Sequence, residues 1–105
     1  MAWFWLLLAA VFEIGWPLGF KLSQQPAWRI GGIALALVSM GLSGWLLWLA
    51  QREIPTGTAY AVWTGIGGAG TFVVGVLFFG DVSSVARWAG VAMIVGGVVT
   101  LKLSS

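Results

Sequence analysis

Long runs without charge constrain the fold of this chain more than any other feature. Residues 30–51 and 54–80 contain no charged side chain, and residues 1–20 contain only one. A helix that crosses the hydrocarbon core of a bilayer needs about 20 predominantly apolar residues. The runs are continuously apolar, whereas the strands of a membrane barrel alternate apolar and polar residues, so we expect helices.

The runs predict membrane-spanning helices at about residues 3–20, 30–50, 56–79 and 85–103. Composition agrees, because the chain is 60% hydrophobic and 8% charged, whereas soluble domains are about 25% charged. No signal-peptide cleavage site follows the first run, so we expect that run to be retained. The sequence therefore predicts an all-α membrane protein with four transmembrane helices in a single domain, residues 1–105.

Composition also narrows the chemistry. The chain has no cysteine and no histidine, which excludes disulfides, thiol chemistry and histidine-based metal sites. No nucleophile–base pair or phosphate-binding loop is present, so we expect no enzyme, no cofactor and no metal. The net charge of only +2 indicates no nucleic-acid partner. Several of the eight tryptophans lie near the ends of the runs, where indole rings anchor in membrane lipid.

Positive charge is balanced across the predicted membrane. Lys21, Arg29 and Arg87 fall on one side, while Arg52, Lys102 and the α-amino group fall on the other. The positive-inside rule then gives almost no preferred orientation. Either the count is noise in a chain with few charges, or copies insert both ways and pair antiparallel.

Glu13 is the one charged side chain in the first run. At about 1.5 Å per residue it lies about 15 Å from Trp3 and about 12 Å from Lys21, close to the middle of a hydrocarbon core about 30 Å thick. An ionisable group there is costly and by default marks a functional site. The other two acids lie in predicted connections.

Polar side chains on three predicted helices can surround this carboxyl group. Trp16 is one helical turn after Glu13, Ser39 and Ser43 are four apart, and Tyr60 and Trp63 are three apart. The candidate substrate- and proton-binding residues are Glu13, Trp16, Ser43, Tyr60 and Trp63. Each neighbour also has a structural reading, since serine can bond its own helix carbonyls and aromatic rings can pack or anchor at the interface.

A proton and an organic cation would compete for Glu13. A carboxylate without a counter-charge is costly in a medium of low dielectric constant, so either a bound proton or an arriving cation must neutralise it. Aromatic faces add cation–π attraction for the cation. Mutually exclusive binding of this kind is the minimal requirement for antiport.

Two glycine patterns stand out in the later runs. Residues 65–70 match G-x-G-x-x-G, but that dinucleotide fingerprint needs a soluble strand–helix context that is absent here. In a membrane helix such glycines permit close packing or bending, and we interpret Gly65, Gly67 and Gly68 as a hinge. Gly90 and Gly97 form a small-residue stripe that fits either a dimer interface or packing within the chain.

Over essentially its full length the sequence resembles the small multidrug resistance transporters. The resemblance rests on Glu13, on Lys21 eight residues later, on residues 55–67 (PTGTAYAVWTGIG), and on Gly90 with Gly97. It implies a multi-pass protein of the bacterial inner membrane that forms an antiparallel, dual-topology homodimer. Both Glu13 side chains would share one site lined by tyrosine and tryptophan, with proton-coupled alternating access, a bending third helix and dimerisation through the fourth.

Trp16, Ser43 and residues 63–67 resemble the guanidinium-exporting branch of that family, whereas Ala10 and Pro17 depart from its pattern. Pro17 removes an N–H donor and is expected to kink the helix beside the site. The leading hypothesis is a proton-coupled antiporter that exports guanidinium or substituted guanidinium cations. The alternatives are a broad exporter of quaternary ammonium compounds and a small membrane subunit of a larger complex.

Overall fold

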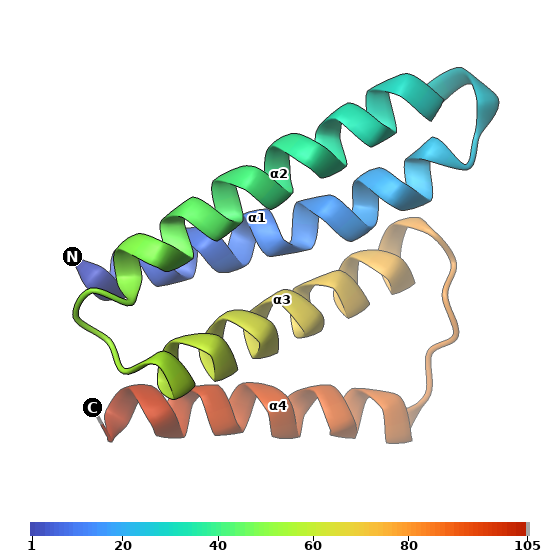
Figure 1. Cartoon of the computed structure of the whole chain (residues 1–105). Helices are drawn as coiled ribbons and strands as arrows, with labels where there is room; N and C mark the ends of the chain where they lie inside the picture. The colour runs from blue at the N-terminus through green and yellow to red at the C-terminus, as the bar shows by residue number, and fades with distance from the viewer. Residues whose placement is uncertain (105) are drawn as a thin grey trace.

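The computed structural model describes residues 1–104 of the chain, which form four α-helices and one short 3-10 helix (Figure 1). These elements are α1 (Ala2–Ser23), η1 (Pro26–Trp28), α2 (Arg29–Ala50), α3 (Thr56–Phe78) and α4 (Val85–Leu103). Each α-helix is long and apolar enough to cross a membrane. The prediction of an all-helical chain with four transmembrane helices is therefore confirmed.

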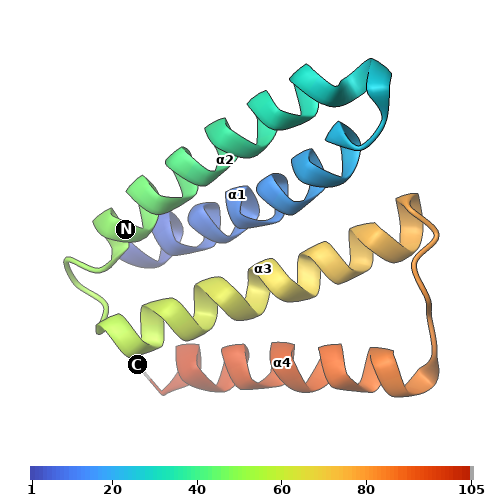
Figure 2. The same ribbon diagram turned by 45° about the vertical axis from the view of Figure 1, so that its right-hand side comes forward.

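Helix α1 lies between α2 and α3 and packs on both (Figures 1 and 2). Successive helices run antiparallel, so both ends of the described chain lie at the same end of the bundle. Helices α2 and α3 scarcely touch each other and diverge toward the end that carries η1. The three helices thus form a wedge, with α1 between α2 and α3.

The closed end of the wedge contains the buried apolar core. Small and medium-sized side chains from the start of α1, the connection after α2 and the start of α3 form it: Ala2, Leu6, Ala50, Ile54, Ala59 and Val62. This cluster joins three helices next to the short connection 51–55. The opposite end of the wedge has no comparable cluster among the described residues.

Helices α1 and α2 meet through their backbones. A Cβ atom on Gly19 or Gly32 would collide with main-chain atoms of the facing helix. The face of α2 that meets α1 continues with buried Ala36, Ser39 and Ser43. Lipid tails are as apolar as side chains, so close van der Waals contact between small residues is what holds membrane helices together.

Pro17 does not end α1, which continues without a break to Ser23. Helix α1 therefore extends three residues beyond the expected end at residue 20. Neighbouring helices pack along its length, and tertiary contacts of this kind let a transmembrane helix tolerate an internal proline.

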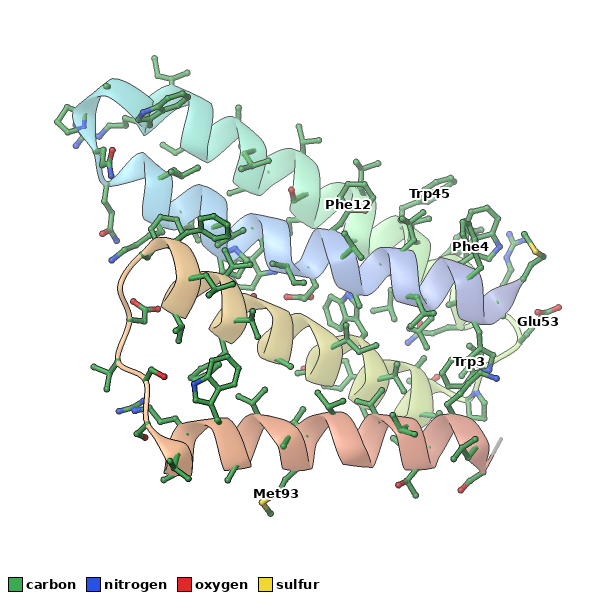
Figure 3. All side chains as sticks on the ribbon, turned by 180° about the vertical axis from the view of Figure 1, so that it is seen from behind. Trp3, Phe4, Phe12, Trp45, Glu53 and Met93 are labelled. Carbon is green, nitrogen blue, oxygen red and sulfur yellow. The ribbon has the colours of Figure 1, made fainter. Side chains whose placement is uncertain are left out.

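Helix α4 packs mainly on α3 and has no buried residue. Its contact uses Gly65 of α3, where a Cβ atom would lie 2.7 Å from Val98 Cγ2 and 3.3 Å from Ile94 Cγ2. The Lys102 ammonium lies 4.8 Å from the centre of the Trp3 ring. On the other face Met93 points away from the rest of the chain (Figure 3).

The glycine contact between α1 and α2 predicts a large effect of one added side chain. Gly32→Val should lower the free energy of unfolding by about 2 kcal/mol or more, because main-chain atoms of α1 cannot move aside. Gly41→Val, on the same helix with nothing within 4 Å of its Cβ position, is the matched control. Unfolding in mixed detergent followed by circular dichroism measures both. Equal stability of the two variants would contradict the backbone contact.

Candidate substrate-binding site

Glu13 reaches the middle of the helix bundle because α3 carries a glycine opposite it. A Cβ atom on Gly67 would collide with Glu13 Cγ and lie 3.0 Å from Glu13 Cβ. No other residue type leaves this space empty. Gly67 therefore makes room for the carboxyl-bearing side chain at the contact between α1 and α3.

The two oxygens of the Glu13 carboxyl group have different surroundings. The Trp16 indole Nε1–H donates a hydrogen bond to Oε1 from the next turn of α1. Oε2 is buried and has no hydrogen-bond partner among residues 1–104. A buried polar atom without a partner is destabilising, so such atoms in folded proteins call for an explanation. Oε2 is therefore a hydrogen-bond acceptor that the described chain leaves unused.

A second hydrogen-bond chain connects three helices. The Trp63 Nε1–H of α3 donates to the Ser43 hydroxyl of α2 at 2.8 Å, and this hydroxyl donates to the Ala9 carbonyl of α1 at 2.7 Å. Ser43 is buried. Its hydroxyl thus bonds between helices instead of to its own helix. Ser39 has a packing role, since its side chain fills the space above Gly15.

The two tryptophans and Ser43 line a hollow of about 290 Å³ beside the carboxyl group. Its lining residues are Glu13, Trp16, Met40, Ser43, Gly44 and Trp63. Four of the five predicted binding residues are thus brought together. The fifth, Tyr60, lies outside the lining, is 56% exposed, and has its ring centre 5.6 Å from that of Trp63.

Sequence reasoning missed Met40 and Gly44 as lining residues. Met40 lies one helical turn before Ser43, and Gly44 directly follows Ser43. Their position relative to Ser43 was therefore a usable signal. Which flank of α2 faces Trp63 depends on how α2 and α3 diverge, and helical spacing does not contain that information.

The glycines of α3 face different neighbours. Gly65 packs on α4, Gly67 packs on Glu13, and a Cβ atom on Gly68 would meet nothing within 4 Å. The structure thus gives the first two a close-packing role. Helix α3 is continuous from Thr56 to Phe78, and a hinge at these glycines stays a prediction.

The glycine stripe of α4 faces away from the rest of the chain. A Cβ atom on Gly90 or Gly97 would meet nothing within 4 Å among the described residues. The stripe therefore does not pack on another helix of the same chain, and a dimer interface remains the reading to test.

Comparison with known proteins identifies the family of this chain. The family model described as Small Multidrug Resistance protein matches residues 1–94. The chain belongs to this family.

Curated relatives align along the whole chain. A protein named guanidinium exporter from Yersinia pestis is 41% identical over 105 residues, which is all of both chains. Proteins of the same name from Citrobacter freundii and Salmonella typhimurium strain LT2 are 40% and 38% identical, covering all of this chain and 99% of theirs. Family membership confirms the predictions of a transporter rather than an enzyme and of a multi-pass protein of the bacterial inner membrane.

The hydrogen bonds Trp63–Ser43 and Trp88–Ser83 provide a matched test of the hydrogen bonds that connect the helices. Ser43→Ala should shift the indole N–H resonance of Trp63 and lower the free energy of unfolding by about 1–3 kcal/mol, because a buried donor loses its acceptor. Ser83→Ala removes the exposed acceptor of Trp88 and should shift only the Trp88 resonance, with a smaller loss of stability. Nuclear magnetic resonance of the indole groups measures this. An unmoved Trp63 resonance in Ser43→Ala would rule out the bond.

Proposed function

We propose that this chain is a proton-coupled antiporter for guanidinium or substituted guanidinium cations, in which two copies of Glu13 form one shared site. The proposal rests on the different surroundings of the two oxygens of the Glu13 carboxyl group. One oxygen is held by the Trp16 indole, while the other is buried without a partner. A planar cation with several N–H donors can supply the missing hydrogen bond together with the missing charge.

The names of the relatives support the same substrate class. Guanidinium exporters from several bacteria are 38–41% identical to this chain over its full length. Trp16 and Ser43, on which the resemblance to that branch rested, occupy the hydrogen-bonding positions next to Glu13 and Trp63. A quaternary ammonium ion has no N–H to offer Oε2, so the guanidinium class is the better fit.

Exchange of a proton for a cation follows if the single Glu13 carboxyl group binds one or the other but not both. Glu13 is the only acid within the α-helices, since Glu53 and Asp81 lie in connections. In an apolar surrounding the carboxylate needs either a proton or a cation. Entry of a cation then expels the proton, and protonation releases the cation. The two binding events are thereby coupled without a second ionisable residue.

An antiparallel homodimer would complete the site. Helix α4 has no buried residue and presents Gly90 and Gly97 away from the rest of the described chain, which suits close packing on a second copy. Positive charges are balanced between the two ends of the bundle, which permits insertion in both orientations. Helices α2 and α3 diverge toward one end of the bundle only, so those of an inverted partner would diverge toward the other side of the membrane. In alternating access the two copies would then exchange conformations, so that the site faces first one side of the membrane and then the other.

The first test compares cations on reconstituted protein. Guanidinium should evoke a current on a solid-supported membrane, and Glu13→Gln should abolish both the current and the release of protons on substrate addition. Glu53→Gln, the same change in a connection outside the helices, should retain both signals.

Two outcomes of this test would contradict the proposal. A tetraalkylammonium current without a guanidinium current would favour the broad quaternary ammonium exporter. Equal behaviour of the wild type and Glu13→Gln, with no current for any cation, would favour a role as a small subunit of a larger complex.

The dual-topology prediction has its own test. Two lysines added to the connection 51–55 should fix one orientation, and two added to residues 24–28 should fix the other. Each variant should confer less than about a tenth of wild-type export when produced alone, since it lacks an inverted partner, and co-production should restore export. Full export by either variant alone would contradict the antiparallel dimer. A guanidinium-tolerance assay in cells provides the measurement.

A further inference from the structure

We propose that a second hollow next to Glu13 binds a hydroxyl-bearing substituent on the guanidinium substrate. This inference rests on the proposed function and specifies which substituted guanidinium compounds the site prefers. The hollow measures about 260 Å³ and is lined by Glu13, Trp16, Pro17, Thr64, Gly67, Gly68 and Thr71. It shares Glu13 and Trp16 with the first hollow, so one ligand can pair with the carboxylate and extend into both.

Thr64 and Thr71 give this hollow two hydroxyl groups with free hydrogen-bonding capacity. They are seven residues apart on α3, which places them on one face about 10 Å apart. Neither makes a hydrogen bond within the described chain. Thr100 of α4 behaves differently, since its hydroxyl donates to the Gly96 carbonyl at 2.8 Å. Threonine hydroxyls in helices often bond a carbonyl of their own helix. The hydroxyls of Thr64 and Thr71 do not.

Pro17 adds a further acceptor at the same place. Residue 17 is the position whose N–H would bond the Glu13 carbonyl four residues earlier, and proline has no N–H. A proline ring in a helix also crowds the carbonyl four residues earlier, and both Glu13 and Pro17 line the hollow. The Glu13 main chain thus lacks its normal helix partner at the residue whose side chain binds the cation.

The hollow has room for a substituent beside Gly68, where a Cβ atom would meet nothing within 4 Å, whereas Glu13 itself occupies the space over Gly67. Beyond Thr71 it adjoins another hollow of about 190 Å³, whose lining shares Pro17 and Thr71 and includes Lys21 and Asp81. A short substituent can therefore extend from Glu13 toward the end of the helices along a partly polar path.

Matched ligands decide whether the hollow recognises a hydroxyl group. Hydroxyethylguanidinium and propylguanidinium have nearly the same size and differ in a terminal hydroxyl or methyl group. A site with free hydrogen-bonding groups disfavours the analogue that cannot pair with them. One hydrogen bond is worth about 1.4 kcal/mol, so the wild type should transport the hydroxyethyl compound with about tenfold higher kcat/KM.

Isosteric variants test the two threonines. Thr64→Val and Thr71→Val keep the shape but remove the hydroxyl. One ligand hydroxyl cannot bond two threonines about 10 Å apart, so one of the two changes should reduce the hydroxyethyl-to-propyl ratio severalfold, and the serine variant at that position should preserve it. Pro17→Ala, which restores an N–H for the Glu13 carbonyl, should also reduce the ratio. Thr100→Val removes a hydroxyl that already bonds Gly96 and should leave the ratio unchanged.

The readouts separate this inference from the proposed function. Guanidinium current that depends on Glu13, combined with a wild type that does not prefer the hydroxyethyl compound, would overturn the subsite and leave the exporter standing. A preference that survives in the Thr64→Val, Thr71→Val double variant would overturn it as well. If the double variant transports nothing, the test of the subsite is the preference of the wild type for the hydroxyethyl compound and the preservation of that preference in the serine variants. Absence of any guanidinium current would instead refute the proposed function.

Discussion

A carboxyl group inside an apolar helix bundle is the constraint on which the rest of this structure depends. Glu13 needs hydrogen-bond partners and space at a depth where water provides neither. Trp16 supplies a donor from the same helix, and Gly67 supplies space from the facing helix. The remaining oxygen stays buried without a partner, and the proposed binding of a cation rests on this unmet requirement.

Small residues are the means by which the helices approach closely enough to build this site. Gly19 and Gly32 bring α1 and α2 into backbone contact. Ser43 then bridges the Ala9 carbonyl and the Trp63 indole across three helices. The hydrogen bonds fix the side chains on one flank of the carboxyl group, while the other flank carries hydroxyls without partners. The two hollows next to Glu13 therefore differ in chemistry although they share one charged residue.

The wedge shape of the first three helices and the uncovered fourth helix belong together. Helices α1, α2 and α3 form the site and splay toward one end, whereas α4 packs mainly on α3 and meets α1 through Lys102 and Trp3. A membrane protein can leave an apolar helix uncovered without the penalty that water would impose. Outward-facing glycines at positions 90 and 97 leave α4 able to pack closely on another helix.

The sequence by itself determined the helical class and the four spans, and it named Trp16, Ser43 and Trp63 as the polar neighbours expected for Glu13. These follow from run length and local spacing, since an uncharged run has one stable form in a bilayer and residues three or four apart share a face. Only the tertiary structure decided that Ser43 bonds between helices, that Gly67 accommodates Glu13, and that Met40, Gly44, Thr64 and Thr71 line the two hollows. Those features depend on the rotation and divergence of one helix against another. Many small contacts set these angles jointly, and no local pattern in the sequence records them.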